Sequence, residues 1–258
     1  YKRIILTQEM ALPGGWGEIE RLSVLDFPGL NSGSRRDVYL CLKELDAAHA
    51  NMLFLRADLP NDEDIQELMN LIVEAKTHHV DLSDRVIPII NFFDAYRYGL
   101  QEFPEDDLDA KTPRKALQRV RDFFSKEDVA GVRQGFDVFD QRILGNLRLK
   151  GDWRYHLISP SAALDPTQLE RDDQKFRRFY EDNKGIYGQL LGDVKSALSE
   201  LKKDKANNRD EIAKCERLKY AIEEYLNDGG IEELRTSLGD TLREKGARLI
   251  VEDARVPL

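Results

Sequence analysis

The sequence is poor in cysteine and lacks long apolar runs, which argues against a disulfide-stabilised protein and against a membrane-spanning one. Its 258 residues include 2 cysteines, Cys41 and Cys215. Both lie in helical patterns beside apolar residues, so we expect free thiols in a reducing compartment and no disulfide framework. The 4 histidines are scattered without the spacing of zinc ligands. No apolar run approaches the roughly 18 residues that a transmembrane helix needs, and no signal peptide is recognisable, so we expect a cytoplasmic protein.

The chain also lacks an excess of positive charge. Its formal net charge is -9, and 34% of its residues are charged. Nucleic-acid binding normally requires a basic surface that neutralises phosphates, and we find no Lys/Arg run with interleaved aromatic residues. We therefore expect no nucleic-acid partner. Aromatic residues make up only 9% of the chain, which together with the high charge favours many solvated helices.

Short apolar segments alternate with helical patterns in the first two thirds of the chain. Such nearly continuous runs of Ile, Leu and Val predict strands that are covered on both faces, as in a mostly parallel sheet. The predicted strands are Arg3–Thr7, Arg21–Leu25, Met52–Ala57, Arg85–Ile90 and Tyr155–Ser159. The predicted helical regions are Asp37–Ala50, Asp62–Thr77 and Pro113–Leu144. This order predicts an α/β fold with a doubly wound, mostly parallel sheet flanked by helices.

The last third of the chain has a different pattern. Thr167–Asn227 contains no proline, and its Leu and Ile residues recur at helical spacing on both sides of a polar break at Lys205–Asn208. We predict an antiparallel helical hairpin, which Gly229 and Gly230 terminate. A final helix is predicted over Ile231–Lys245, ending at Gly246. The sequence thus divides into an α/β core (1–165), a hairpin insertion (166–228) and a final core helix with an exit segment (229–258).

An acidic motif follows the second predicted strand. Asp26-Phe27-Pro28-Gly29 places a carboxylate at the end of a buried strand, where α/β sheets bind their ligands. There Asp26 can hold Mg²⁺ through water, and Gly29 can offer its backbone N–H to a phosphate because no side chain blocks close approach. The alternative is an ordinary Asp-x-Pro-Gly turn after a strand.

Two further motifs end later strands. Asn91-Phe92-Phe93-Asp94 has Asn and Asp at a spacing that suits guanine, because a carboxylate accepts two hydrogen bonds from the N1–H and N2–H₂ edge that adenine lacks. The small residues Ser161 and Ala162 follow another strand and allow backbone N–H groups to approach a base carbonyl. The alternatives are a helix N-cap at Asp94 and a Ser-Pro turn with Ser161 as an N-cap.

Together these motifs resemble those of the dynamin-like large GTPases, particularly the bacterial ones. Asp26–Gly29 is similar to the Asp-x-x-Gly motif in its Asp-x-Pro-Gly form, Asn91–Asp94 to the Asn/Thr-Lys-x-Asp motif, and Ser161-Ala162 to the Ser-Ala motif. The run Ala50–Pro60 and the segment from Gly229 to about residue 250 resemble further parts of such a domain. The resemblance covers about residues 1–165 and 229–250.

The resemblance implies a P-loop-NTPase-like domain that binds and hydrolyses GTP with Mg²⁺. It implies that Asp26 binds Mg²⁺ through water and that Gly29 senses the γ-phosphate. Asn91, Asp94, Ser161 and Ala162 would contact the guanine base. The family also implies self-association and a peripheral attachment to membranes through regions outside this chain.

The sequence departs from the family pattern in two respects. Phe92 stands where the family has Lys, whose stem covers the purine, and an aromatic ring could stack on the same face. No Gly-x-x-x-x-Gly-Lys-Ser/Thr loop occurs in the chain, so these residues include no nest of N–H groups for the phosphates. We therefore expect an upstream segment before Tyr1 that supplies this loop and the central strand of the sheet. The alternative is a nucleotide-free pseudo-GTPase that acts as a protein-interaction or assembly module.

Overall fold

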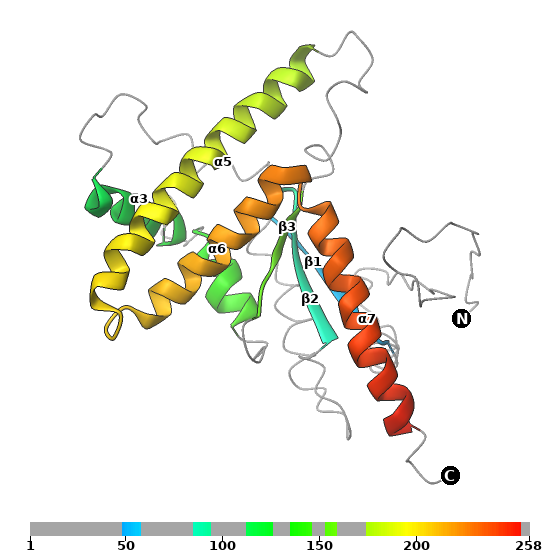
Figure 1. Ribbon diagram of the computed structural model, residues 1–258. Helices are drawn as coiled ribbons and strands as arrows, with labels where there is room; N and C mark the ends of the chain where they lie inside the picture. Colours follow the sequence, from blue (N-terminus) through cyan, green and yellow to red (C-terminus); the bar gives the residue numbers. More distant parts are fainter. Residues whose placement is uncertain are drawn as a thin grey trace, which may run out of the picture.

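In the part of the chain that the structure describes, the sheet has three parallel strands that follow one another in chain order. The computed structural model describes residues 48–57, 85–93, 112–125, 135–145, 153–158 and 174–253. Strands β1 (Asn51–Arg56), β2 (Val86–Asn91) and β3 (His156–Ile158) lie side by side in the order β1-β2-β3. Every pairing is parallel, so the carboxyl ends of the three strands reach the same edge of the sheet (Figure 1). The predicted α/β architecture is confirmed at this level.

The three strands agree with predicted strands to within one residue at every end. β2 and β3 are buried on both faces, as the Ile- and Leu-rich runs predict, and β3 also buries the side chain of His156. β1 differs, because its side chains alternate: Leu53 and Leu55 are buried, whereas Met52 and Phe54 are 37% and 51% exposed. The expectation that strands are covered on both faces is therefore wrong for β1.

Helix α7 covers one face of the sheet. α7 (Ile231–Asp253) packs Leu234 and Leu238 against an apolar cluster formed by β2 and β3 (Figure 1). The buried members of this cluster are Ile87, Ile89 and Ile158. In β2 these positions alternate with those that face the other side, which is the period of a strand.

Four helical elements cover the opposite face and form the main core with the sheet (Figure 1). They are α3 (Pro113–Ser125), the π-helix η5 (Val138–Leu144), α5 (Gln174–Leu201) and α6 (Arg209–Asp228). Their apolar residues recur every three or four positions, which aligns them on one helical face. The largest fully buried side chains of this core are Phe93, Phe123, Phe136, Phe139, Tyr155 and Tyr187.

Helices α5 and α6 form the predicted hairpin, and the hairpin shares its core with the sheet. The short 3₁₀-helix η6 (Lys202–Asp204) and a polar turn separate the two helices at the predicted break. Leu190, Val194, Leu218 and Ile222 are buried in the same apolar cluster as Leu53 and Leu55 of β1. The periodic Leu and Ile residues of the hairpin thus pack into the apolar core that the hairpin shares with the sheet.

The end of α6 has the predicted glycine signal. Gly229 adopts a left-handed backbone with φ 79°, and its N–H donates to the Tyr225 carbonyl at 2.9 Å. The Asp228 carboxylate then accepts hydrogen bonds from the backbone N–H groups of Gly230, Ile231 and Glu232. The same aspartate therefore ends α6 and caps the first turn of α7, which satisfies N–H groups that have no partner within the helix.

Three predicted helix boundaries are wrong. The region Pro113–Leu144 is not one helix: α3 ends at Ser125, and η5 begins only at Val138. Residues 48–50 are not helical, because the chain turns there before β1. The final helix continues through Gly246 to Asp253, since a glycine weakens a helix by about 1 kcal/mol without forcing it to end. The predicted strands 3–7 and 21–25 and the predicted helix 62–77 lie outside the described residues.

Candidate functional site

The carboxyl ends of β1 and β2 bring Arg56 and Asn91 together. These residues are partners in the parallel register, and the N–H of Ala57 donates to the Asn91 carbonyl at 2.9 Å. Ile158 at the end of β3 is the register partner of Asn91 on the other side. This edge is where parallel α/β sheets bind ligands, because the loops there diverge from the strand ends. It is also the edge at which the sequence places its candidate residues.

Phe92 has an unusual backbone conformation directly after β2. Its φ is 56°, and it is the only non-glycine residue with positive φ in the described part of the chain. A left-handed conformation costs an L-residue with a bulky side chain about 1–2 kcal/mol. The side-chain oxygen Oδ1 of Asn91 accepts a hydrogen bond from the Phe92 N–H at 2.8 Å and so braces this turn.

The ring of Phe92 projects from this strained turn toward solvent. The residue is 44% exposed. The Arg56 guanidinium carbon lies 5.7 Å from the centre of the Phe92 ring, within the range of a cation–π contact. An exposed aromatic ring and an arginine therefore lie together at the edge of the sheet formed by the carboxyl ends of the strands. Backbone strain of this kind concentrates at functional positions, where the surrounding structure holds it in place.

Phe93 anchors the same turn in the core. It is fully buried, and its ring stacks on Tyr187 of α5 at a centroid distance of 4.7 Å. The Tyr187 hydroxyl donates to the Phe93 carbonyl at 2.7 Å. Tyr225 of α6 meets the Phe93 ring edge-on at 5.4 Å. Sequence reasoning identified the Asn-Phe-Phe-Asp segment but missed Tyr187 and Tyr225, although both occupy core positions in the helical repeat of the hairpin.

Of the predicted site residues, the structure describes Asn91. Asp26, Gly29, Asp94, Ser161 and Ala162 lie outside the described residues, as does Cys41. Asn91 occupies the predicted strand end, with its amide oxygen bonded to the following backbone N–H. Among the residues that the structure describes, no group of three or more His, Cys, Asp or Glu side chains is arranged to hold a metal ion.

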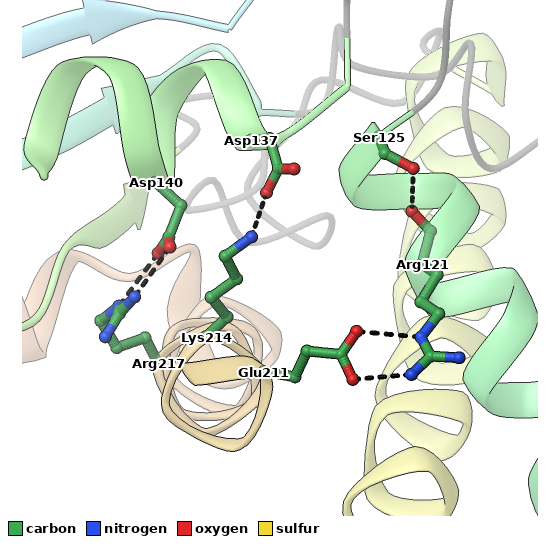
Figure 2. Close-up of polar contacts among 7 residues, drawn as sticks. All are labelled: Arg121, Ser125, Asp137, Asp140, Glu211, Lys214 and Arg217. Atoms are coloured by element: carbon green, nitrogen blue, oxygen red, sulfur yellow. Dashed lines mark hydrogen bonds and ion pairs between the residues drawn. The ribbon is translucent and has the colours of Figure 1, made fainter. Parts of the chain in front are cut away.

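A second group of polar residues lines a cavity between α3 and α6. The cavity has a volume of about 230 Å³, and its apolar wall includes Val120, Phe124 and Cys215. At its rim the Arg121 guanidinium makes two hydrogen bonds to Glu211, at 2.9 and 2.8 Å (Figure 2). The hydrogen bond to Glu211 raises the pKa of Arg121, so this cation remains charged.

Asp137 and Lys214, which also line the cavity, form a second ion pair. Lys214 donates to Asp137 at 2.6 Å, and the neighbouring Arg217 binds Asp140 through two hydrogen bonds (Figure 2). Burial raises the pKa of the Cys215 thiol to about 12, so this cysteine is protonated and unreactive at neutral pH. These charges are paired with one another across α3, η5 and α6, which indicates a structural role in joining these elements.

Comparisons with known proteins gave no match. No protein-family model, curated protein or solved structure matches the chain. Within the described residues, no helix is both long enough and apolar enough to cross a lipid bilayer.

Proposed function

We propose that this chain is a P-loop-NTPase-like domain that binds guanine nucleotide at the carboxyl ends of its strands, as part of a dynamin-like GTPase. The observation that carries the proposal is the exposed ring of Phe92, held at positive φ beside the ends of β1 and β2. An exposed, strained aromatic residue at this edge is costly for folding alone, and binding a base would explain its presence. The parallel order β1-β2-β3 also agrees with such a domain.

Phe92 provides a surface on which a purine can stack. Stacking of a base on an aromatic ring contributes about 1–3 kcal/mol, and it needs an accessible ring face. Phe92 is 44% exposed, and the Arg56 guanidinium lies near the same ring. In this proposal the Phe92 ring covers the base in place of the aliphatic stem of a lysine. Asn91 contributes by fixing the turn that presents the ring.

Base recognition and hydrolysis in this proposal involve residues outside the described part of the chain. Asp94 accepts hydrogen bonds from the guanine N1–H and N2–H₂ edge, and Ser161 and Ala162 approach the base carbonyl. Asp26 holds Mg²⁺ through water, and Gly29 contacts the γ-phosphate. Mg²⁺ held there would supply positive charge near the phosphates, which would favour attack of water on the γ-phosphate.

The second candidate is a pseudo-GTPase that serves as an interaction or assembly module. It is favoured by the absence of a Gly-x-x-x-x-Gly-Lys-Ser/Thr sequence from all 258 residues, together with Phe92 in the lysine position of the motif. Without such a loop these residues offer no known cradle of backbone N–H groups for the phosphates. The two candidates differ in whether guanine nucleotide binds at all.

Fluorescent mant-GTP and mant-ATP, titrated into the chain with Mg²⁺ present, separate the candidates. We expect mant-GTP to bind more tightly than mant-ATP. Unlabelled guanosine, GDP and GTP should compete with nearly equal affinity if only the base is recognised. A phosphate-release assay then tests hydrolysis. Equal binding of mant-GTP and mant-ATP, or binding of neither, would reject the guanine proposal and leave the interaction module.

A pair of matched variants tests the role of Phe92. Phe54 is also an exposed phenylalanine on the sheet, at 51%, but it lies on β1 within the strand. We expect Phe92→Ala to weaken mant-GTP binding about tenfold, which corresponds to about 1.4 kcal/mol of stacking. Phe54→Ala should leave the affinity unchanged. Equal effects of the two substitutions would contradict a specific role for Phe92.

A further inference from the structure

The turn after β2 is tied to the helical hairpin by one buried hydrogen bond. The Tyr187 hydroxyl of α5 donates to the Phe93 carbonyl at 2.7 Å, across 94 positions of sequence. Both residues are fully buried. A buried carbonyl is costly to leave without a donor, so this bond helps to fix the position of the Phe93 backbone relative to α5.

Aromatic rings from both helices of the hairpin hold the Phe93 side chain. Phe93 stacks on Tyr187 at 4.7 Å and meets Tyr225 edge-on at 5.4 Å. Tyr187 and Tyr225 also contact each other edge-on at 5.1 Å, so the three rings form one unit that joins α5 and α6 to the turn. The stacked and edge-on geometries are the two favourable arrangements of aromatic pairs.

Phe92 lies between two fixed points. On its N-terminal side Asn91 belongs to the sheet, and its carbonyl accepts the Ala57 N–H at 2.9 Å. On its C-terminal side Phe93 is anchored by Tyr187. The single residue between these anchors has the positive φ of 56°. The strained conformation that exposes the Phe92 ring therefore depends on the hairpin as well as on the strand.

We propose that Tyr187 is a positioning residue that sets the affinity of the nucleotide site through Phe93, and that the hairpin responds to nucleotide in return. This inference rests on the proposed function, because it concerns the same turn. Thermodynamic coupling is reciprocal: if the hairpin stabilises the binding conformation of the turn, a bound base stabilises the contact between the turn and the hairpin. Tyr187 itself touches no ligand in this proposal.

Tyr187→Phe removes the hydroxyl and keeps the ring. We expect the variant to bind mant-GTP about five- to tenfold more weakly, the change that corresponds to one net hydrogen bond. Tyr220→Phe is the matched control, because Tyr220 lies on the same hairpin but is 43% exposed, with its ring against Arg154 at 3.8 Å. This control should bind like the parent chain.

Amide hydrogen exchange provides a readout that does not require nucleotide. In Tyr187→Phe, exchange should accelerate for peptides that contain residues 91–93, while the peptides of α6 exchange at the parental rate. In the parent chain, added GTP should slow exchange around residue 187, and this protection should be lost in the variant. Uniformly faster exchange throughout the variant would indicate general destabilisation and overturn the positioning role.

The outcomes separate this inference from the proposed function. If the parent chain binds no nucleotide, the proposed function fails, and the role of Tyr187 in setting the affinity fails with it. Faster amide exchange at residues 91–93 in Tyr187→Phe would still show that Tyr187 positions the turn. If the parent chain binds mant-GTP, and Tyr187→Phe binds within twofold with unchanged exchange at residues 91–93, the proposed function stands and the role of Tyr187 is rejected. If the variant does not fold, GTP-dependent protection around residue 187 in the parent chain decides the question.

Discussion

Arg217 of α6 binds Asp140 of the π-helix η5 through two hydrogen bonds, of 2.9 and 2.7 Å, in a site where the Asp140 side chain is 1% exposed. The Arg217 guanidinium also lies 4.1 Å from the Trp153 ring centre. A π-helical turn is rare and less stable than an α-helical one, so it needs outside support. The bidentate pair provides such support by attaching η5 to the hairpin.

Removing one partner of this buried pair should destabilise the chain strongly. We expect Arg217→Met to lower the free energy of unfolding by about 3–5 kcal/mol, because the Asp140 carboxylate would remain buried without its cation. The double variant Arg217→Met/Asp140→Asn should recover part of this loss. Urea denaturation followed by circular dichroism measures both. A loss below about 1 kcal/mol in the single variant would show that the Asp140 carboxylate gains another partner.

The Arg121–Glu211 pair provides a matched control in the same region. It has the same bidentate geometry, but its side chains are 46% and 39% exposed. Water and salt screen an exposed pair, so Arg121→Met should cost only about 0–1 kcal/mol. A large loss here would mean that Arg121 contributes through packing of its stem over the cavity.

Gly230 should not tolerate a side chain. Its φ is +77°, and a Cβ atom there would lie 2.0 Å from the Leu157 carbonyl oxygen, which belongs to the backbone of β3 and cannot rotate away. We expect Gly230→Ala to lower stability by at least about 3 kcal/mol, from backbone strain and displacement of α7. Gly188→Ala is the control: nothing lies within 4 Å of its added Cβ, so the substitution should stabilise α5 by about 0.5–1 kcal/mol.

The buried thiol of Cys215 should make stability depend on pH in alkaline solution. Burial raises the pKa of this thiol from 9.0 to about 12. The unfolded chain therefore loses the thiol proton first as pH rises, and stability falls from about pH 9 up to about pH 12. In a Cys41→Ala background, which isolates this thiol, iodoacetamide should label Cys215 slowly at about pH 8 and readily after denaturation.

The control for this effect is Cys41→Ala/Cys215→Ala. Subtracting its pH profile removes the contributions of lysine and tyrosine residues that titrate in the same range. A constant stability difference between the two variants from about pH 8 to about pH 11 would show that the thiol pKa is not raised.

Substitution of Phe92 by glycine should change the free energy of unfolding and the affinity for mant-GTP in opposite directions. Phe92→Gly relieves the positive φ and should increase the free energy of unfolding by about 0.5–1 kcal/mol, while it weakens mant-GTP binding. Phe92→Ala removes the same ring but keeps a Cβ and most of the strain, so it should bind as weakly without the gain in stability. A glycine variant that is less stable than the alanine variant would show that the turn is unstrained.

The strands and the hairpin could be predicted because their signals are local. The apolar runs around Leu53, Ile89 and Leu157 predicted strands whose boundaries are correct to within one residue at every end. The repeat of leucines in α5 and α6 and the glycines at 229 and 230 gave the hairpin and its end. The prediction failed at Gly246 because a glycine ends a helix only where the chain needs a left-handed turn, and α7 continues.

The candidate site could be predicted only in part. The sequence pointed to Asn91, and the structure places it at the carboxyl end of β2 beside Arg56, its partner in the register. It could not indicate that Phe92 has a positive φ, since few residues other than Gly, Asn and Asp favour that conformation and nothing in the local sequence requires it.

The sequence by itself determined the positions of the three described strands and of the helical hairpin, because the 2- and 3.6-residue periods can be recognised among neighbouring residues. Only the tertiary structure decided which distant residues meet. Tyr187 reaches Phe93 across 94 positions, and Arg217 reaches Asp140 across 77. These contacts form because the hairpin buries its apolar face in the same core as the sheet. The polar side chains that are buried with that face then need hydrogen-bond or charged partners, which the sheet and the shorter helices provide.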